Sequence, residues 1–152
     1  MRETFPIVPG SVSILWILAP ISLIVLGALG LLVASLSGAR TARFEVSEEG
    51  LRLRGDLYGR LIPAADLRGE AARPVDLRSE TELAPVWRTL GTAVPGYRAG
   101  WFRLRNREKA LLYVTDSSRV VYLPTRAGYV VLLSVADPSA FIASVRRIAP
   151  QP

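Results

Sequence analysis

Residues 100–134 read GWFRLRNREKALLYVTDSSRVVYLPTRAGYVVLLS and carry the clearest structural signal in the 152-residue chain. Turn-forming residues separate four short runs of aliphatic, β-branched and aromatic residues: 100–106, 110–115, 119–123 and 129–134. Short strands at regular spacing are typical of a β-barrel or a β-sandwich. This stretch therefore predicts a mainly-β domain.

The residues that follow predict one closing helix, at 137–148. Asp137 suits the N-cap, because its carboxylate accepts from free backbone amides, and Pro138 suits the first helical position. An apolar stripe then recurs at the spacing of one helix face: Phe141, Val145 and Ile148. We expect this stripe to plug the open end of a small barrel.

Alternation of polar and apolar residues predicts four further strands before residue 79: 42–47, 51–54, 57–63 and 71–77. The first two are joined as a hairpin by the turn Glu48-Glu49-Gly50. Pro74 has no amide donor, which places the fourth strand at a sheet edge or a bulge.

Residues 79–98 show no regular pattern and include Pro85, Pro95 and Gly96. We expect a long loop here, and loops of this length in compact domains are often functional. Trp87 and Tyr97 within it are expected to pack over the rim of the barrel.

The N-terminal part predicts a membrane anchor. Residues 11–36 read SVSILWILAPISLIVLGALGLLVASL and contain no charged residue. About 20 apolar residues span a bilayer, and lipid forces such a segment to be helical. The expected order is a short segment at 1–10, a transmembrane helix at 11–36 and a linker at 37–41.

Three alternatives compete with this interpretation. A helical hairpin would need about 40 apolar residues, and a buried helix of a soluble protein is rarely apolar on all sides. A cleaved signal peptide fits the small residues Ser37 and Ala39. Its apolar core, however, should span only about 7–15 residues and follow a basic start. The length of the apolar segment favours the uncleaved anchor.

The basic residues that flank this segment predict its orientation. Arg40 and Arg43 follow it closely, whereas only Arg2 and the α-amino group precede it. An excess of flanking arginine and lysine marks the cytoplasmic side. We therefore expect a cytoplasmic C-terminal domain.

A stripe of small residues lies on one face of the expected helix: Gly30, Ala34 and Gly38. Such stripes let two helices approach closely, which would give a homodimer. The alternative is that glycine and alanine are simply common in membrane helices.

Composition narrows the range of functions. The net charge is +6, and the whole excess lies in residues 40–152, which suits anionic lipid headgroups or nucleic acid. No known motif for reading nucleic acid occurs, so no nucleic-acid partner is expected. The chain contains neither cysteine nor histidine, which excludes disulfides and triads of His or Cys and removes the usual ligands of zinc, copper and haem.

Carboxylates are dense in two places, at Glu48-Glu49 and among Asp76, Glu80 and Glu82. Paired carboxylates are able to do acid–base chemistry or hold a hard cation. Neighbours in a turn normally point apart into water, so we interpret these residues as solvated. We therefore expect no catalytic, metal-binding or cofactor-binding residue, and no small-molecule substrate.

The candidate binding surface is basic and aromatic. Four residues alternate along one strand and its turn, opposite Phe102 and Leu104: Trp101, Arg103, Arg105 and Arg107. Tyr97 and Arg98 adjoin them in the sequence. Tryptophan beside guanidinium groups suits a lipid-headgroup or partner surface, while the alternative is an ordinary solvated outer face.

Four segments carry a resemblance to a known family: FEVSEEGLRLRGDLYGRLIPAADL (44–67), LGTAVPGYRAGWFRLRN (90–106), KALLYVT (109–115) and VVYLPTRAGYVVLLSVADPSAF (120–141). The chain resembles membrane-anchored bacterial pleckstrin-homology (PH)-like domains. The resemblance implies a PH-like barrel over 42–148, with seven or eight short antiparallel strands, a capping helix and a tail at 149–152. It also implies a single-pass protein of the bacterial inner membrane.

The resemblance implies an interaction module rather than an enzyme. The first hypothesis is a module that binds a protein partner or scaffolds a membrane complex. The alternative is peripheral contact with anionic lipid through the basic Trp/Arg surface. Phosphoinositide-binding relatives use a basic cluster in the first hairpin loop, whereas the loop here, 47–50, is acidic.

Overall fold

The structure is a computed structural model that describes residues 13–55 and 58–149, without the side chains of residues 13–15 and 34–41. The expected segment 1–10 and most of the expected tail lie outside these ranges. The chain divides into two compact units, residues 1–34 and 35–152, which are treated separately below.

The first unit contains most of α1, a helix that spans Ser13–Thr41 and whose C-terminal part belongs to the second unit. Its central part, Trp16–Val33, has no buried residue and is long and apolar enough to cross a membrane, a test that a signal sequence also passes. Residues 37–41, expected to be a linker, are helical. A single residue, Ala42, therefore separates the end of the helix from the first strand.

The second unit begins with a three-stranded antiparallel sheet, in the order β1-β2-β3: Arg43–Ser47, Gly50–Arg54 and Leu61–Pro63. The predicted hairpin is confirmed, with Val46 opposite Leu51. Leu51 and Leu53 are buried while Arg54 is exposed, as the alternation requires. The third strand is shorter than predicted.

A six-stranded sheet has the order β4-β8-β9-β7-β6-β5. The strands are Arg73–Val75, Pro85–Val94, Tyr97–Leu104, Lys109–Val114, Val120–Pro124 and Val130–Ser134 for β4 to β9. Pairing is antiparallel except between β7 and β9, which run parallel. Pro74 lies in an edge strand, as predicted.

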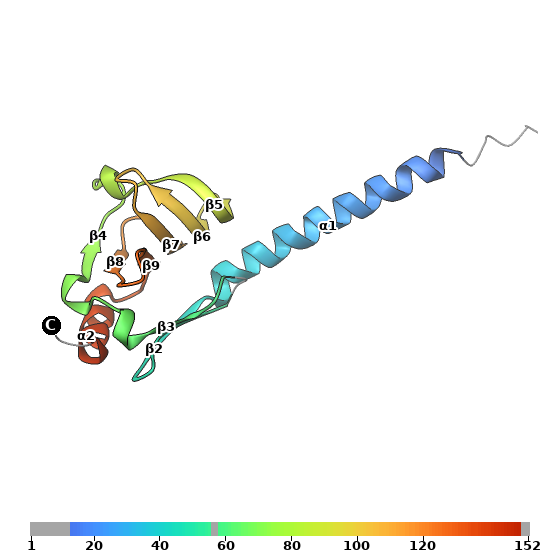
Figure 1. Cartoon of the computed structure of the whole chain (residues 1–152). Helices are drawn as coiled ribbons and strands as arrows, with labels where there is room; N and C mark the ends of the chain where they lie inside the picture. Colours follow the sequence, from blue (N-terminus) through green and yellow to red (C-terminus); the bar gives the residue numbers. More distant parts are fainter. Residues whose placement is uncertain (1–12, 56–57, 150–152) are drawn as a thin grey trace, which may run out of the picture. The chain divides into compact units, whose positions relative to one another are not determined.

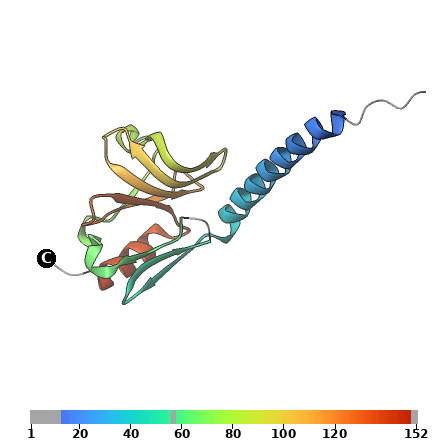
Figure 2. The same cartoon turned by 45° about the vertical axis from the view of Figure 1, so that its right-hand side comes forward.

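Both faces of the six-stranded sheet are packed, which explains why β7 is buried along almost its whole length. Leu111 and Tyr113 join a cluster that includes Leu53, Ile62 and Val145. The intervening Leu112 joins a second cluster with Phe102 and other residues: Val75, Leu77 and Leu83. Figures 1 and 2 show α2 (red) on the same side of this sheet as β2 and β3 of the three-stranded sheet.

The helix α2 spans Pro138–Ile148 and confirms the predicted closing helix. The backbone amide of Ala140 donates to the Asp137 carboxylate at 3.0 Å. Val145 and Ile142 are the residues it buries most deeply, with Phe141 and Ile148 packed against the same cluster. The predicted stripe therefore holds, with Ile142 added to it.

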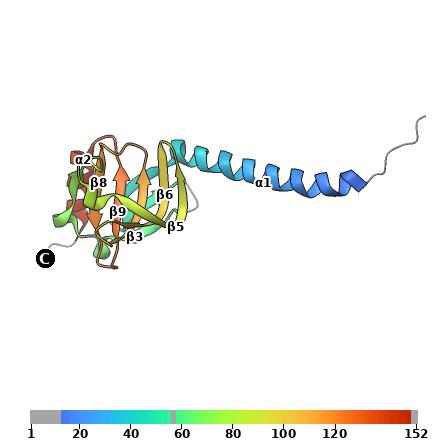
Figure 3. The ribbon, with the colours of Figure 1, turned by 90° about the horizontal axis from the view of Figure 1, so that it is seen from above.

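Two expectations about the sheet are wrong. The sheets are not closed into a barrel: they pack through the first cluster and keep separate edges. The alternating pattern sets which face of a strand is buried, but not which strand edges meet. Residues 79–98 are also no long loop, because they contain all of β5, paired with β6 (Figure 3).

The irregular sequence of β5 has a physical cause. Its register against β6 shifts between Pro85 and Trp87 and again between Arg88 and Leu90, which breaks the period of two. Gly91 lies opposite Gly100, whose φ is +112°, and a Cβ at either position would meet backbone atoms of the other strand within 2.5 Å. The two strands therefore approach so closely that only glycine fits.

Candidate functional site

Side chains on one face of β5, β6 and β7 form a continuous surface. Leu90 is opposite Trp101, Trp87 is opposite Arg103, and Arg103 is opposite Lys109. Residues directly opposite in antiparallel strands point to the same side of the sheet. We call this surface, with Arg60 and Tyr129 above Trp101, the Trp/Arg face: Arg60, Trp87, Leu90, Trp101, Arg103, Lys109 and Tyr129.

Trp101 lies at the centre of the Trp/Arg face. The Arg60 guanidinium carbon is 4.9 Å from the ring centroid and the Lys109 Nζ is 4.4 Å from it. The Tyr129 ring meets the indole edge-on, with centroids 5.0 Å apart. The electron-rich indole face attracts both cations, so three separate segments of the chain are held together here.

The outer part of the Trp/Arg face is uncovered. Trp87 is 71% exposed and Leu90 is 62% exposed. Large apolar side chains grouped at the surface mark an interaction site more often than scattered ones do. Trp87 was expected to pack over a barrel rim, and the structure instead leaves it in solvent, because β5 is the outermost strand of its sheet.

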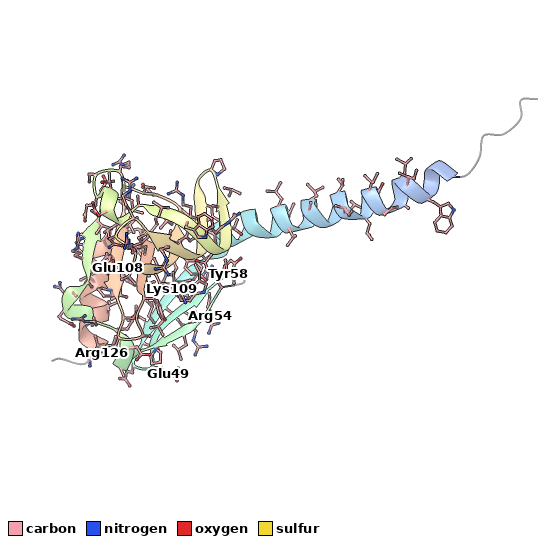
Figure 4. All side chains as sticks on the ribbon, turned by 45° about the horizontal axis from the view of Figure 1, so that its top comes forward. Glu49, Arg54, Tyr58, Glu108, Lys109 and Arg126 are labelled. Atoms are coloured by element: carbon pink, nitrogen blue, oxygen red, sulfur yellow. The ribbon has the colours of Figure 1, made fainter. Side chains whose placement is uncertain are left out.

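A basic cleft adjoins this face at the end of the sheet where β7 begins. It encloses about 840 Å³. Most of the charged side chains that line it are cations: Arg68, Arg73, Arg103, Arg107 and Lys109. Among the described lining residues Glu108 is the one acid, and Figure 4 shows it beside Lys109.

The cations of the cleft differ in how far they are neutralised. Arg73 pairs with Glu80 at 2.8 Å, and Arg68 pairs with Glu70 at 3.4 Å. Within the described residues, no carboxylate lies within ion-pair distance of the remaining three: Arg103, Arg107 and Lys109. These three therefore give the cleft its net positive charge.

The carboxylate of Glu108 is already engaged. It accepts from the Tyr122 hydroxyl at 3.1 Å and from the Asn106 side-chain amide at 2.6 Å. Burial raises the pKa of Tyr122, and the charge of Glu108 raises it further, so the hydroxyl stays protonated and donates. Arg73 lies over the Tyr122 ring, 5.3 Å from its centroid. The hydrogen bond to Glu80 raises the pKa of Arg73, which keeps it charged.

The residues that the sequence assigned to one candidate binding surface lie in different places in the structure. Trp101 and Arg103 lie on the Trp/Arg face, and Arg107, at the β6–β7 turn with φ +71°, lines the cleft. Arg105 is exposed outside the cleft. Arg98 lies at the other end of β6, beside the 95–96 turn.

Tyr97 is not a surface residue. It is 4% exposed and packs within the first core cluster, because its place at the start of β6 turns it toward the three-stranded sheet. Of the helix stripe, Gly30 is described, and a Cβ there would meet no atom of the chain within 4 Å. The side chains of Ala34, Gly38 and Arg40 lie outside the described set, while Arg43 is exposed in β1.

Sequence reasoning missed several members of the site. Trp87 and Leu90 were hidden by the register shifts in β5. Arg60 reaches Trp101 from the connection between β2 and β3, and Tyr129 reaches it from the turn before β9. Such contacts between distant segments leave no local pattern in the sequence.

Two of the carboxylates that are dense in the sequence are held in surface interactions. Asp76 accepts from Arg78, and Glu80 pairs with Arg73. In the described ranges no three residues of the types His, Cys, Asp and Glu are grouped so that they could hold a metal ion. The Trp/Arg face and the basic cleft thus bring cations and aromatic rings together on one surface.

Comparison with known proteins adds one match. A family model described as "Bacterial PH domain" matches residues 42–149, the whole of the two sheets and α2. No curated protein and no solved structure matches the chain.

Proposed function

The chain belongs to the bacterial PH domain family, and we propose that it is a membrane-anchored interaction module whose Trp/Arg face contacts anionic lipid. PH domains are in general non-catalytic modules that bind proteins or lipids. The observation that carries the proposal is the grouping of exposed Trp87 and Leu90 with the cations Arg103 and Lys109 on one side of one sheet.

This combination of side chains matches the chemistry of a bilayer surface. Tryptophan prefers the level of the headgroups, where its ring meets apolar chains and its N–H meets water. Each basic residue close to an anionic leaflet contributes about 1 kcal/mol of binding energy. The adjoining basic cleft extends the positive surface to Arg107.

The chain connection supports the same proposal. In our proposal α1 crosses the membrane, and β1 begins two residues after α1 ends at Thr41. The β-domain then has no free linker and stays close to the bilayer surface. The basic residues Arg40 and Arg43 on the C-terminal side support a cytoplasmic β-domain at the inner membrane of a bacterium.

Vesicle binding tests the lipid contact. A fragment of residues 40–152, which holds both core clusters, should bind vesicles that contain phosphatidylglycerol and release them as salt is raised. Removing two cations of the face, Arg103→Ala with Lys109→Ala, should weaken binding about 30-fold, at about 1 kcal/mol each. Arg119→Ala is the control, since Arg119 is exposed and ion-paired to Asp116 outside the face.

Two outcomes would count against this function. If the fragment ignores anionic vesicles at low salt, the face does not bind lipid. If Arg119→Ala weakens binding as much as the double change, net charge alone is responsible.

The orientation has its own test, because the chain has no cysteine. Ser117→Cys in the full chain should be protected from an impermeant thiol reagent in intact cells. Ready labelling would place the β-domain outside the cytoplasm.

A protein partner is the second candidate function, and β5 favours it. An exposed edge strand offers unpaired backbone groups to another strand. This proposal includes a scaffolding role in a membrane complex.

A further inference from the structure

We propose that β5 pairs edge to edge with β5 of a second copy of the chain, which joins the two six-stranded sheets into one. The partner of the open strand would thus be a second copy of the same chain. The pairing does not depend on lipid contact, except that the argument from two chains in one bilayer rests on the proposed function.

The outer edge of β5 is the feature that requires an explanation. β5 is ten residues long and ends the six-stranded sheet, with no strand on its outer side within the described ranges. Residues 86–90 are exposed without interruption and include Val86, Trp87 and Leu90. Long apolar edge strands aggregate or pair, and proteins normally shield them with charge, proline or a covering element.

The side chains of β5 are compatible with self-pairing. Two copies of one strand pair antiparallel about a twofold axis, and an axis at Leu90 sets Leu90 opposite Leu90 of the second copy. The register shift between Arg88 and Leu90 then brings Trp87 opposite Thr92, on the same side of the sheet. Arg88, the one charged residue in β5, falls opposite Gly91 or Thr92, so the two arginines do not meet.

The symmetry of this pairing also suits two chains in one bilayer. A twofold axis perpendicular to the joined sheet leaves the Trp/Arg faces of both copies on the same side. If those faces contact lipid, as proposed above, both reach the same leaflet at once. A parallel arrangement of two β5 strands lacks this symmetry. Anchoring in one membrane also raises the effective concentration of one copy for another.

Disulfide formation in the full chain tests the pairing. Leu90→Cys introduces the only cysteine, at an exposed position. Opposite residues of an antiparallel pair have Cα atoms about 4.5–5.5 Å apart, within the range of a disulfide. Mild oxidation in membranes should therefore convert most of this variant to a covalent dimer.

Val86→Cys is the matched control. Val86 is also exposed and in the same strand. Trp87 already lies two strand steps from Leu90, so the two copies of residue 86 would lie more than about 13 Å apart, at about 3.3 Å for each of four steps. The control should stay monomeric under the same oxidation. Cross-linking at residue 90 without cross-linking at residue 86 supports a twofold axis at Leu90.

Other patterns overturn the proposal. Equal cross-linking at residues 86 and 90 would indicate random collision in the membrane. A Leu90→Cys variant that stays monomeric, yet whose thiol is protected from a soluble reagent, would show that lipid or a different protein covers β5.

One further variant distinguishes a failure of the lipid proposal from a failure of the dimer proposal. Adding Arg103→Ala and Lys109→Ala to the Leu90→Cys variant should abolish most vesicle binding and leave its disulfide dimer intact. Unchanged vesicle binding with a retained dimer would therefore refute only lipid contact through the Trp/Arg face. Retained vesicle binding without a dimer refutes only the pairing.

Discussion

The two edge strands of the six-stranded sheet, β4 and β5, are built in opposite ways. β4 has three residues, of which Pro74 has no amide to offer, and α2 packs against it together with the 3-10 turn η2, Gly69–Ala71. The Arg146 guanidinium closes this edge by donating to the carbonyls of Gly69 and Ala72, at 3.2 and 3.1 Å. β5 has ten residues and five consecutive exposed side chains.

This difference suggests that the two edges of one sheet have different roles: the β4 edge contributes to folding stability, and the β5 edge is available for binding. Burial of the β4 edge completes the core, so changes there should cost folding energy. The β5 edge contributes little burial, so changes there should alter binding and leave folding nearly unaffected. The three predictions below test this contrast in the fragment of residues 40–152.

Truncating one leucine beside the β4 edge and one in the β5 edge should give the largest difference. Leu123 in β8, the strand that pairs with β4, is 0% exposed, whereas Leu90 in β5 is 62% exposed. Leu123→Ala should lower the free energy of unfolding by about 2–5 kcal/mol, because it leaves a cavity in the core. Leu90→Ala should change it by less than about 0.5 kcal/mol. Urea denaturation measures both, and similar losses at the two positions would contradict the contrast.

The glycine contact is the place where the β5 edge does affect folding. Gly100→Ala should lower the free energy of unfolding by about 1–3 kcal/mol, because φ is +112° and the new Cβ would meet the Leu90 carbonyl oxygen at 2.4 Å. Gly96→Ala is the control, with φ +79° and no atom within 4 Å of the new Cβ. It should cost about 1 kcal/mol, from the backbone conformation alone. Equal losses would mean that the close approach of the strands is not limiting.

The smallest predicted effect is a change in the pKa of Asp76, which lies directly after β4. The Arg78 side chain, and then its backbone amide, hydrogen-bond the carboxylate of Asp76 and lower its pKa. A lowered folded-state pKa contributes stability above the unfolded value of about 3.9, and this stability is lost as the pH falls through the folded pKa. NMR titration should therefore show Asp76 below the usual range, and Arg78→Ala should raise its pKa. Arg119→Ala, which removes a charge near Asp116, should leave Asp76 unchanged.

Much of the fold was accessible from the sequence because it follows local patterns. The β1–β2 hairpin and α2 with its Asp137 cap each depend on neighbouring residues, and the structure confirms them. The strand β5 escaped prediction because its two register shifts and Gly91 disrupt the alternation. The parallel pairing of β7 with β9 and the separate sheets depend on contacts between distant residues.

The residues of the candidate site also fall into two groups: those that a local pattern predicts and those that depend on distant contacts. Trp101 and Arg103 were predictable because they alternate with buried Phe102 and Leu104 along β6. Tyr97 was misplaced, since the sequence gives no sign that the inner end of β6 lies under the three-stranded sheet. Arg60 joined the site only through the packing of that sheet's connection over the indole ring.

The position of Trp101 has an optical consequence. Its indole ring lies between a cation from the connection of the three-stranded sheet, Arg60, and a cation from the six-stranded sheet, Lys109. Indole emission responds to nearby charge, so its wavelength should depend on whether both cations stay over the ring. An anion that draws Lys109 away, or a separation of the two sheets that withdraws Arg60, would each change the spectrum. The emission of Trp101 should therefore report on the separation of the two sheets.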